Sequence, residues 1–143
     1  MTGCAPRTVI ENTSHGRHQV STHQFLGRTK PSQEKTRRKA AELEAKGAFV
    51  PTIVLHEVYK FEYETVGADA AMVRVNSIVR SNFQIIDLDT KIALSAAQLR
   101  CRYRDLPTAD SIIAATAIEL KSNTVFTDDP HFQKIREIDV EWI

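Results

Sequence analysis

The fold is best indicated by residues 107–117, Pro-Thr-Ala-Asp-Ser-Ile-Ile-Ala-Ala-Thr-Ala. This stretch is apolar on nearly all sides, which is typical of a helix at the centre of a domain. Its one charge, Asp110, falls in the first turn, where the helix dipole favours an anion. Burial of an ionised carboxylate is costly without a partner, so we expect Asp110 either to help cap the helix or to bind a cation.

A second run, Val-Phe-Thr-Asp-Asp-Pro-His-Phe at residues 125–132, places Asp128 and Asp129 just after a short apolar segment. Glu57 is a third isolated acid, among the apolar residues of the helix expected from Thr52 onward. Each acid has an ordinary alternative as a helix cap or a solvent-exposed residue. Their joint occurrence near strand ends favours a divalent cation site, because carboxylate oxygens are the ligands that hard cations prefer.

Helices and strands are predicted to alternate outward from these two runs. Apolar spacing and turn residues predict the following segments: strands at 48–51, 83–86, 124–126 and 140–143, and helices at 33–46, from 52 to about 66, 68–80, 90–104, 109–120 and 130–136. Residues 1–27 show no period of any length, and only 8–10 resembles the core of a strand. Helix caps are expected at Ser32, Thr52, Thr108 and the Asp87–Asp89 turn. This alternation indicates an α/β domain with a mostly parallel sheet.

Length and composition limit the classes of protein to consider. The 143 residues, 42% hydrophobic and 26% charged, fit one soluble globular domain with its own core. We expect a cytoplasmic protein without a membrane span, because no long apolar run and no signal-peptide pattern occur. Cys4 and Cys101 form no metal-binding or disulfide pattern.

Charge is distributed unevenly along the chain. Residues 1–48 hold nine Lys and Arg against four acids, whereas residues 49–143 hold ten against fourteen. A basic arm that attracts a polyanion and a solvated helix face both explain this pattern. Candidate polyanion-attracting residues are the Lys and Arg of segment 28–39 together with Arg100, Arg102 and Arg104.

The acids and their flanking residues resemble the PIN-domain family of metal-dependent ribonucleases, most closely the toxin components of prokaryotic toxin–antitoxin pairs. The likeness rests on the runs at 50–59, 106–117, 127–132 and 140–143. It implies a Rossmann-like α/β fold with a mostly parallel central sheet and helices on both sides. It also implies one PIN-like domain over residues 28–143, preceded by an atypical segment, 1–27.

The resemblance also implies the site. Glu57, Asp110 and Asp129 match the family's second, third and fourth acids, which would hold Mg²⁺ or Mn²⁺ and hydrolyse RNA. Asp128 occupies a variable position of the fourth motif and could bind the metal through water, and Thr127 is a candidate substrate-binding residue. Implied partners are an RNA substrate, a cognate antitoxin protein and a second copy of the chain in a homodimer.

The beginning of the chain departs from the family, whose first strand ends in an Asp that is the first metal ligand. This sequence has no Asp before Asp69, and Glu11 either replaces that acid or the acid is missing. We therefore expect a weak nuclease. Two rival functions stay open: a non-catalytic PIN-like module that binds RNA or protein, and an unrelated phosphohydrolase. Of the histidines beside the acids, His56 is expected to pack and His131 to lie on the surface.

Overall fold

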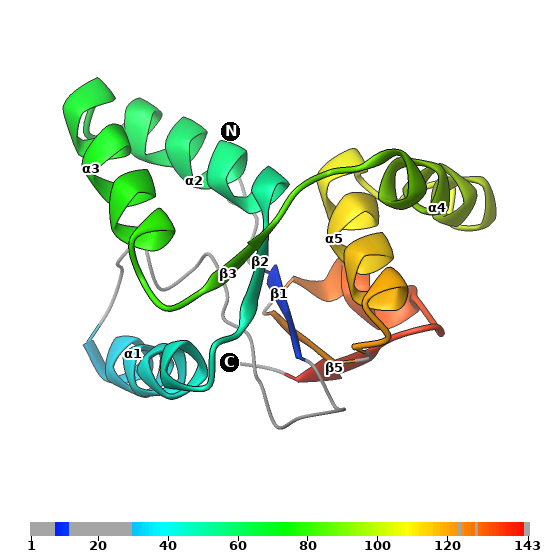
Figure 1. The fold of residues 1–143 in the computed structure, drawn as a ribbon, viewed down its shortest axis with the longest axis horizontal. Coiled ribbons are helices and arrows are strands. Elements are labelled where there is room, and N and C mark those ends of the chain that lie inside the picture. The colour runs from blue at the N-terminus through cyan, green and yellow to red at the C-terminus, as the bar shows by residue number, and fades with distance from the viewer. Residues whose placement is uncertain (1–7, 12–29, 123, 128, 142–143) are drawn as a thin grey trace.

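The computed structural model of this protein describes residues 8–11, 30–122, 124–127 and 129–141. The described elements are, in chain order, β1 (Thr8–Glu11), α1 (Lys30–Ala45), β2 (Phe49–Pro51), α2 (Thr52–Thr65), α3 (Ala68–Val79), β3 (Gln84–Ile86), α4 (Thr90–Arg102), α5 (Thr108–Glu119), β4 (Thr124–Thr127), the 3-10 helix η2 (Pro130–Lys134) and β5 (Asp139–Glu141). The predicted alternation of strands and helices is confirmed (Figure 1).

The sheet has the strand order β3-β2-β1-β4-β5. The pairs β2–β3 and β4–β5 are parallel, whereas β1 is antiparallel to both of its neighbours. Four strands therefore share one direction and the central one runs against them. The prediction of a mostly parallel sheet holds for the outer strands and is corrected at the centre.

This reversed direction determines which end of β1 meets the carboxyl ends of the other strands. Thr8 pairs with Thr127 at the end of β4, and Glu11 pairs with Thr124 at its beginning. The start of β1 thus lies at the carboxyl edge of β4, where ligands gather in α/β sheets. The backbone of Glu11 lies at the opposite edge.

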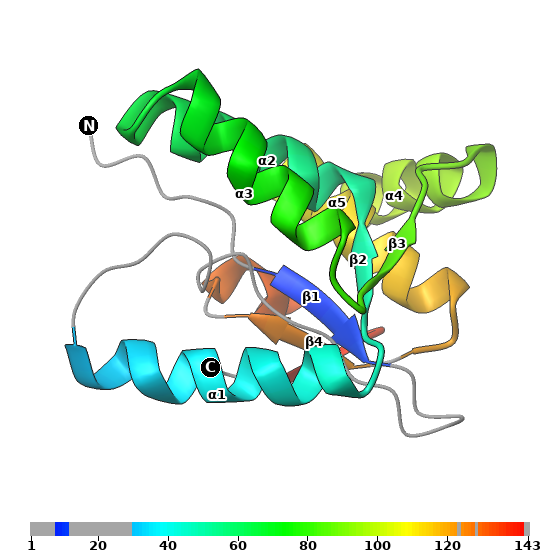
Figure 2. The same cartoon turned by 60° about the vertical axis from the view of Figure 1, so that its left-hand side comes forward.

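Helices cover both faces of the sheet, as the family resemblance implies. Figure 2 shows α1 on one side of the strands and α2, α3, α4 and α5 on the other. From α1, Lys39 places its Nζ 4.9 Å from the centre of the Phe126 ring on β4. Helix α5 packs against β1, β2 and β4, and every residue from Asp110 to Ala117 is buried, which confirms its predicted central position.

Helices α2 and α3 pack against each other and form an arm at one end of the molecule (Figure 1). Ala71 and Ile78 face inward from α3. Met72 and Val79 do not, since each is 48% exposed. Other large apolar residues of this arm are also exposed: Tyr63, Val66 and Val73.

Three of the predicted helix caps are wrong. Ser32 lies inside α1, and α2 and α5 begin after Pro51 and Pro107 without a side-chain cap. Asp89 does cap α4, because its Oδ1 accepts a hydrogen bond of 2.8 Å from the backbone N–H of Ile92. Across the described ranges, no helix combines the length and apolar character that crossing a membrane requires.

Candidate metal centre

Asp110 is a buried carboxylate to which no described residue donates a hydrogen bond. It lies in the first turn of α5, and its side chain is only 5% exposed. It accepts no hydrogen bond from the residues that the structure describes, and the shortest ion-pair distance from its carboxylate is 3.6 Å, to Nδ1 of His131. Burial of an ionised carboxylate without a partner destabilises its charged form. A bound cation would stabilise that form, which is typical of a metal ligand in an apo protein.

Asp129 comes to the same place from the turn that follows β4. Its backbone N–H donates to Oγ1 of Thr127 at 3.0 Å, a hydrogen bond that fixes this turn. Its side chain is 8% exposed and caps η2, with Oδ1 accepting from the backbone N–H of His131 at 2.9 Å. Both bonds hold the carboxylate at the carboxyl edge of the sheet.

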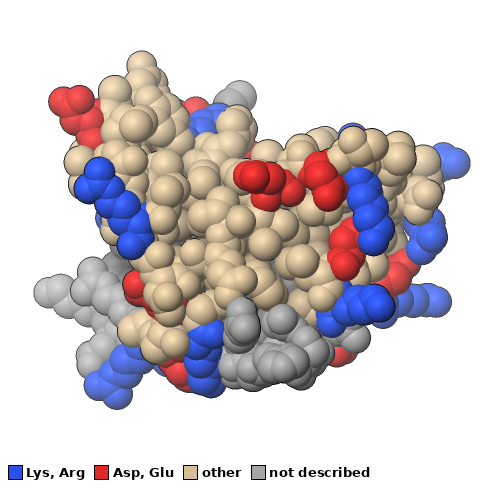
Figure 3. Space-filling model, viewed as in Figure 1, with Lys and Arg blue, Asp and Glu red and all other residues tan. Residues whose placement is uncertain are grey.

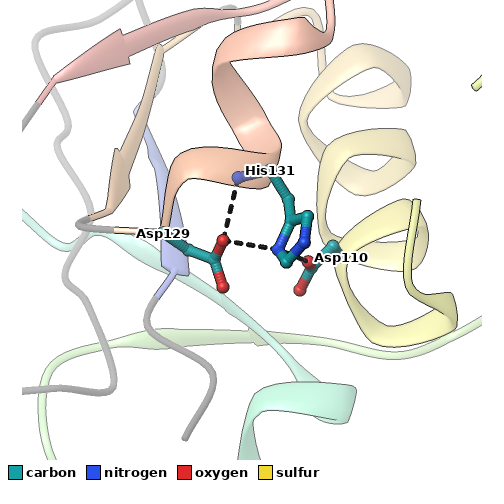
Figure 4. Close-up of side chains that lie close together, drawn as sticks. All are labelled: Asp110, Asp129 and His131. Atoms are coloured by element: carbon teal, nitrogen blue, oxygen red, sulfur yellow. Dashed lines mark hydrogen bonds and ion pairs between the residues drawn. The ribbon is translucent and has the colours of Figure 1, made fainter. Parts of the chain in front are cut away.

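His131 lies between the two aspartates (Figure 4). Its Nδ1 is 2.7 Å from Oδ1 of Asp129 and 3.6 Å from Oδ2 of Asp110. One ligand atom from each of the three residues lies within 4.8 Å of the others. The expectation that His131 lies on the surface is confirmed, since its side chain is 44% exposed, but the ring also belongs to the site. Its position two residues after Asp129, in the first turn of a short helix, was the available sequence signal.

The electrostatics of this cluster are unfavourable to two ionised aspartates. The pKa of Asp110 is raised to about 7, first by burial and then by the negative charge of Asp129. Nearby His131 opposes this rise, and Glu57 adds to it. A carboxyl group with such a pKa is partly protonated near neutral pH, and a cation that replaces the proton relieves the repulsion.

Glu57 contributes its charge from a greater distance. It lies on α2 with its side chain 19% exposed, and its Oε1 is 2.9 Å from Nδ1 of the exposed His56. It is outside the group of ligand atoms within 4.8 Å, yet it is near enough to raise the pKa of Asp110. The structure thus brings Asp110 and Asp129 together, with Glu57 at the margin of the same site.

The remaining predicted site residues fall in different places. Glu11 is placed by its backbone beside Thr124, three residues before the carboxyl end of β4. That is roughly 10 Å along the strand from Thr127, so the reversed β1 places the backbone of Glu11 away from the carboxyl end of β4. Thr127 is fully buried and supports the Asp129 turn. Asp128 lies outside the described residues.

The donors fit a divalent cation by number, chemistry and spacing. Neighbouring donors around an octahedral cation are roughly 3 Å apart, given metal–oxygen distances of about 2.1 Å. The measured separations of 2.7 Å and 3.6 Å from Nδ1 of His131 bracket that value. Only small side-chain movements would bring the donors of Asp110, Asp129 and His131 around one ion, and Glu57 could join directly or through water.

A cavity of about 210 Å³ lies beside the cluster and shares His131 with it. Its other lining residues are Arg102, Tyr103, Arg104, Asp105, Leu106 and Lys134. Arg102 is paired with Glu137 at 2.7 Å, and Nε of Arg100 donates to the carbonyl of Leu106. Two of the arginines predicted to attract a polyanion therefore have protein partners.

Charged side chains of the described residues are unevenly distributed on one face of the molecule. On the face in Figure 3, acidic side chains gather towards the middle and Lys and Arg lie mainly around the margin. This face offers no continuous positive surface, so basic residues near the cluster are the better candidates for contact with a polyanion.

Comparison with known proteins now identifies the class of the chain. A sequence model of the PIN domain matches residues 24–138, and the protein therefore belongs to the PIN-domain family. The matched range begins after β1, so the reversed central strand lies outside it. No curated protein sequence matches the chain.

Two solved structures have a similar fold. VapBC2 from Rickettsia felis, bound to a DNA fragment from its promoter, matches with a TM-score of 0.68 and 17% identity, over 86% of this chain and 96% of that one. DNA-bound VapBC from Salmonella typhimurium matches with a TM-score of 0.64 and 19% identity, over 78% and 86% of the two chains. At these identities the likeness establishes the fold.

Proposed function

We propose that this protein is a metal-dependent endoribonuclease of the PIN-domain toxin type. One observation carries the proposal: Asp110 is buried without a hydrogen-bond donor among the described residues, directly beside a second buried aspartate. The added charge of Glu57 makes the site more negative. A divalent cation is the partner that such a carboxylate group lacks.

The proposed ligands of Mg²⁺ or Mn²⁺ are Glu57, Asp110 and Asp129, with Asp128 as a further candidate through water. When bound, the cation would lower the pKa of a coordinated water and offset charge on the scissile phosphate. The chain itself holds Asp110 on the central helix and Asp129 in a turn fixed by Thr127. Thr127 is buried beneath this turn, which supports a positioning role in place of direct substrate contact.

RNA is the proposed substrate because a cavity with basic residues adjoins the acids. Arg104 and Lys134 line it and are exposed, and neither has an acidic partner in the described part of the chain. Cationic side chains beside a metal site attract and position a phosphodiester backbone. This contact should be sensitive to salt.

Cleavage of a single-stranded RNA tests the proposal. Activity should require Mg²⁺ or Mn²⁺ and disappear in EDTA. Asp110→Asn should lower the rate by about 100-fold or more, because it removes a proposed ligand of the ion. The matched control is Asp69→Asn, an exposed acid in the first turn of α3, which should cleave at the wild-type rate. Cleavage that persists in EDTA would contradict the proposal.

A catalytically impaired module that binds RNA or protein is the second candidate. The reversed β1 favours it, because this strand brings its Thr8 end to the carboxyl edge of β4 and carries Glu11 away. RNA binding without cleavage at high Mg²⁺ and Mn²⁺ would support this candidate. Hydrolysis of a small phosphomonoester would instead point to a general phosphohydrolase.

The proposed protein partner is an antitoxin, as the fold is shared with the VapBC assemblies. Exposed apolar residues on the α2–α3 arm, including Val66 and Val73 at 70% each, support the predicted homodimer, in which a second copy of the chain covers that surface. The homodimer and the cytoplasmic location stay predictions.

A further inference from the structure

We propose that His131 is a direct ligand of the catalytic cation through Nδ1, and that this nitrogen makes the site prefer Mn²⁺ over Mg²⁺. The inference rests on the proposed metal-dependent function and adds a residue and a metal preference to it. The sequence motifs suggested oxygen ligands alone, so the imidazole changes the expected chemistry of the site.

The first support is the position of the ring. Nδ1 faces both buried aspartates, at 2.7 Å from Asp129 and 3.6 Å from Asp110 (Figure 4). Nδ1 shares a hydrogen bond with Oδ1 of Asp129, and a bound cation would replace the shared proton. A histidine that only oriented Asp129 would need to contact that residue alone, whereas this nitrogen approaches both.

The second support is that the backbone holds the ring in place. The N–H of His131 donates to Oδ1 of Asp129, and Pro130 begins the short helix that carries His131 and has Asp129 as its N-cap. His56 provides an internal comparison. It contacts Glu57 at 2.9 Å, but its side chain is 65% exposed and it is not part of the 4.8 Å group.

The third support is the shortage of close oxygen donors. Among the described residues, Asp110 and Asp129 are the carboxylates within 4.8 Å of each other and of the ring. Glu57 lies farther away, and the backbone of Glu11 is at the other sheet edge. His131 therefore supplies the third close donor.

The mixed donor set explains the predicted metal preference. Mg²⁺ is a hard ion that is bound through oxygen and retains several waters. Imidazole nitrogen suits transition metals better, so replacing one oxygen by nitrogen shifts the balance towards Mn²⁺. The preference should appear in binding, without any measurement of catalysis.

Electron spin-echo modulation of bound Mn²⁺ tests the ligand directly. Wild-type protein loaded with one equivalent of Mn²⁺ should show the ¹⁴N modulation of a coordinated imidazole, and ¹⁵N-histidine labelling should change it accordingly. His131→Gln should lose the signal, and the matched variant His56→Gln should keep it. In His131→Gln, we also expect the Kd for Mn²⁺ to rise by about 10-fold with little change for Mg²⁺.

The possible failures are distinguishable. Mn²⁺ that binds wild type without ¹⁴N modulation, or with modulation that persists in His131→Gln, overturns the role of His131 and leaves the carboxylate site standing. Absence of any Mn²⁺ binding to wild type overturns the proposed function as well. The labelling of wild-type protein shows whether a histidine binds the metal, and His56→Gln then tests the other histidine that contacts a proposed ligand even if His131→Gln folds poorly.

Discussion

At the scale of single residues, Asp110 couples the stability of the protein to its proposed chemistry. The pKa of Asp110 is about 4 in the unfolded chain and about 7 in the folded protein. Between these values the folded state holds a proton that the unfolded state releases. The contribution of Asp110 to stability is therefore full below about pH 4 and is lost as the pH rises through about 7.

This linkage predicts a measurable difference between wild type and Asp110→Asn in EDTA. From pH 5 to pH 8, the free energy of unfolding of wild type should fall more than that of the variant, by about 2–3 kcal/mol. Urea unfolding at several pH values measures it, with Asp69→Asn as the control. Parallel pH profiles of the free energy of unfolding for wild type and Asp110→Asn would contradict the raised pKa of this carboxyl group.

The two neighbouring aspartates should behave differently. Asp129 is buried and held by two hydrogen bonds of its turn, and it lies beside Asp110, so Asp129→Asn should abolish most RNA cleavage. Asp128→Asn should cost far less, because its place in the motif is variable in the family. Rates measured on the same RNA at equal Mg²⁺ decide, and equal losses would mean that both aspartates bind the metal.

At the scale of elements, the turn between β4 and η2 positions the site. Thr127→Val keeps the shape of this fully buried side chain but leaves the N–H of Asp129 without its acceptor. The free energy of unfolding should fall by about 1–3 kcal/mol, and Mn²⁺ affinity should fall with it. Calorimetric titration measures the affinity. Thr127→Ser retains the hydroxyl and should behave like wild type. Wild-type Mn²⁺ affinity in Thr127→Val would show that this turn does not position the metal ligands.

Sequence patterns predicted the elements better than their connections. Apolar spacing predicted α5 and β4, because an element that is buried on all sides is composed almost entirely of apolar and small residues, as 107–117 and 124–127 are. Caps were less predictable, since a Thr after Pro can bond elsewhere: Oγ1 of Thr52 accepts from the backbone N–H of Leu88 at 3.3 Å.

Strand direction and side-chain convergence were harder to infer. Alternation along β1 is the same whichever way it runs, so its reversal and the resulting position of Glu11 could not be read from residues 8–11. His131 was missed as part of the site because a histidine two positions from an acid faces solvent as readily as it faces that acid. Its proximity to Asp110 depends on how α5 and η2 pack.

At the scale of the whole molecule, the α2–α3 arm predicts self-association. Val73 on α3 is 70% exposed within a group of apolar side chains, and exposed apolar patches commonly mark protein interfaces. The isolated chain should sediment as a dimer, and Val73→Asp should convert it to a monomer. Leu94→Asp is the matched control, since Leu94 is 61% exposed on α4. A monomeric wild type would contradict the predicted homodimer.

We propose that this PIN domain, whose first strand is reversed, still assembles a cation site from Asp110 and Asp129. Calorimetric titration of Mn²⁺ into the apo protein tests this site directly. We expect binding to wild type, loss of that binding in Asp110→Asn, and unchanged affinity in Glu11→Gln because the backbone of Glu11 lies at the far sheet edge. Equal Mn²⁺ affinity in wild type and Asp110→Asn would contradict the account.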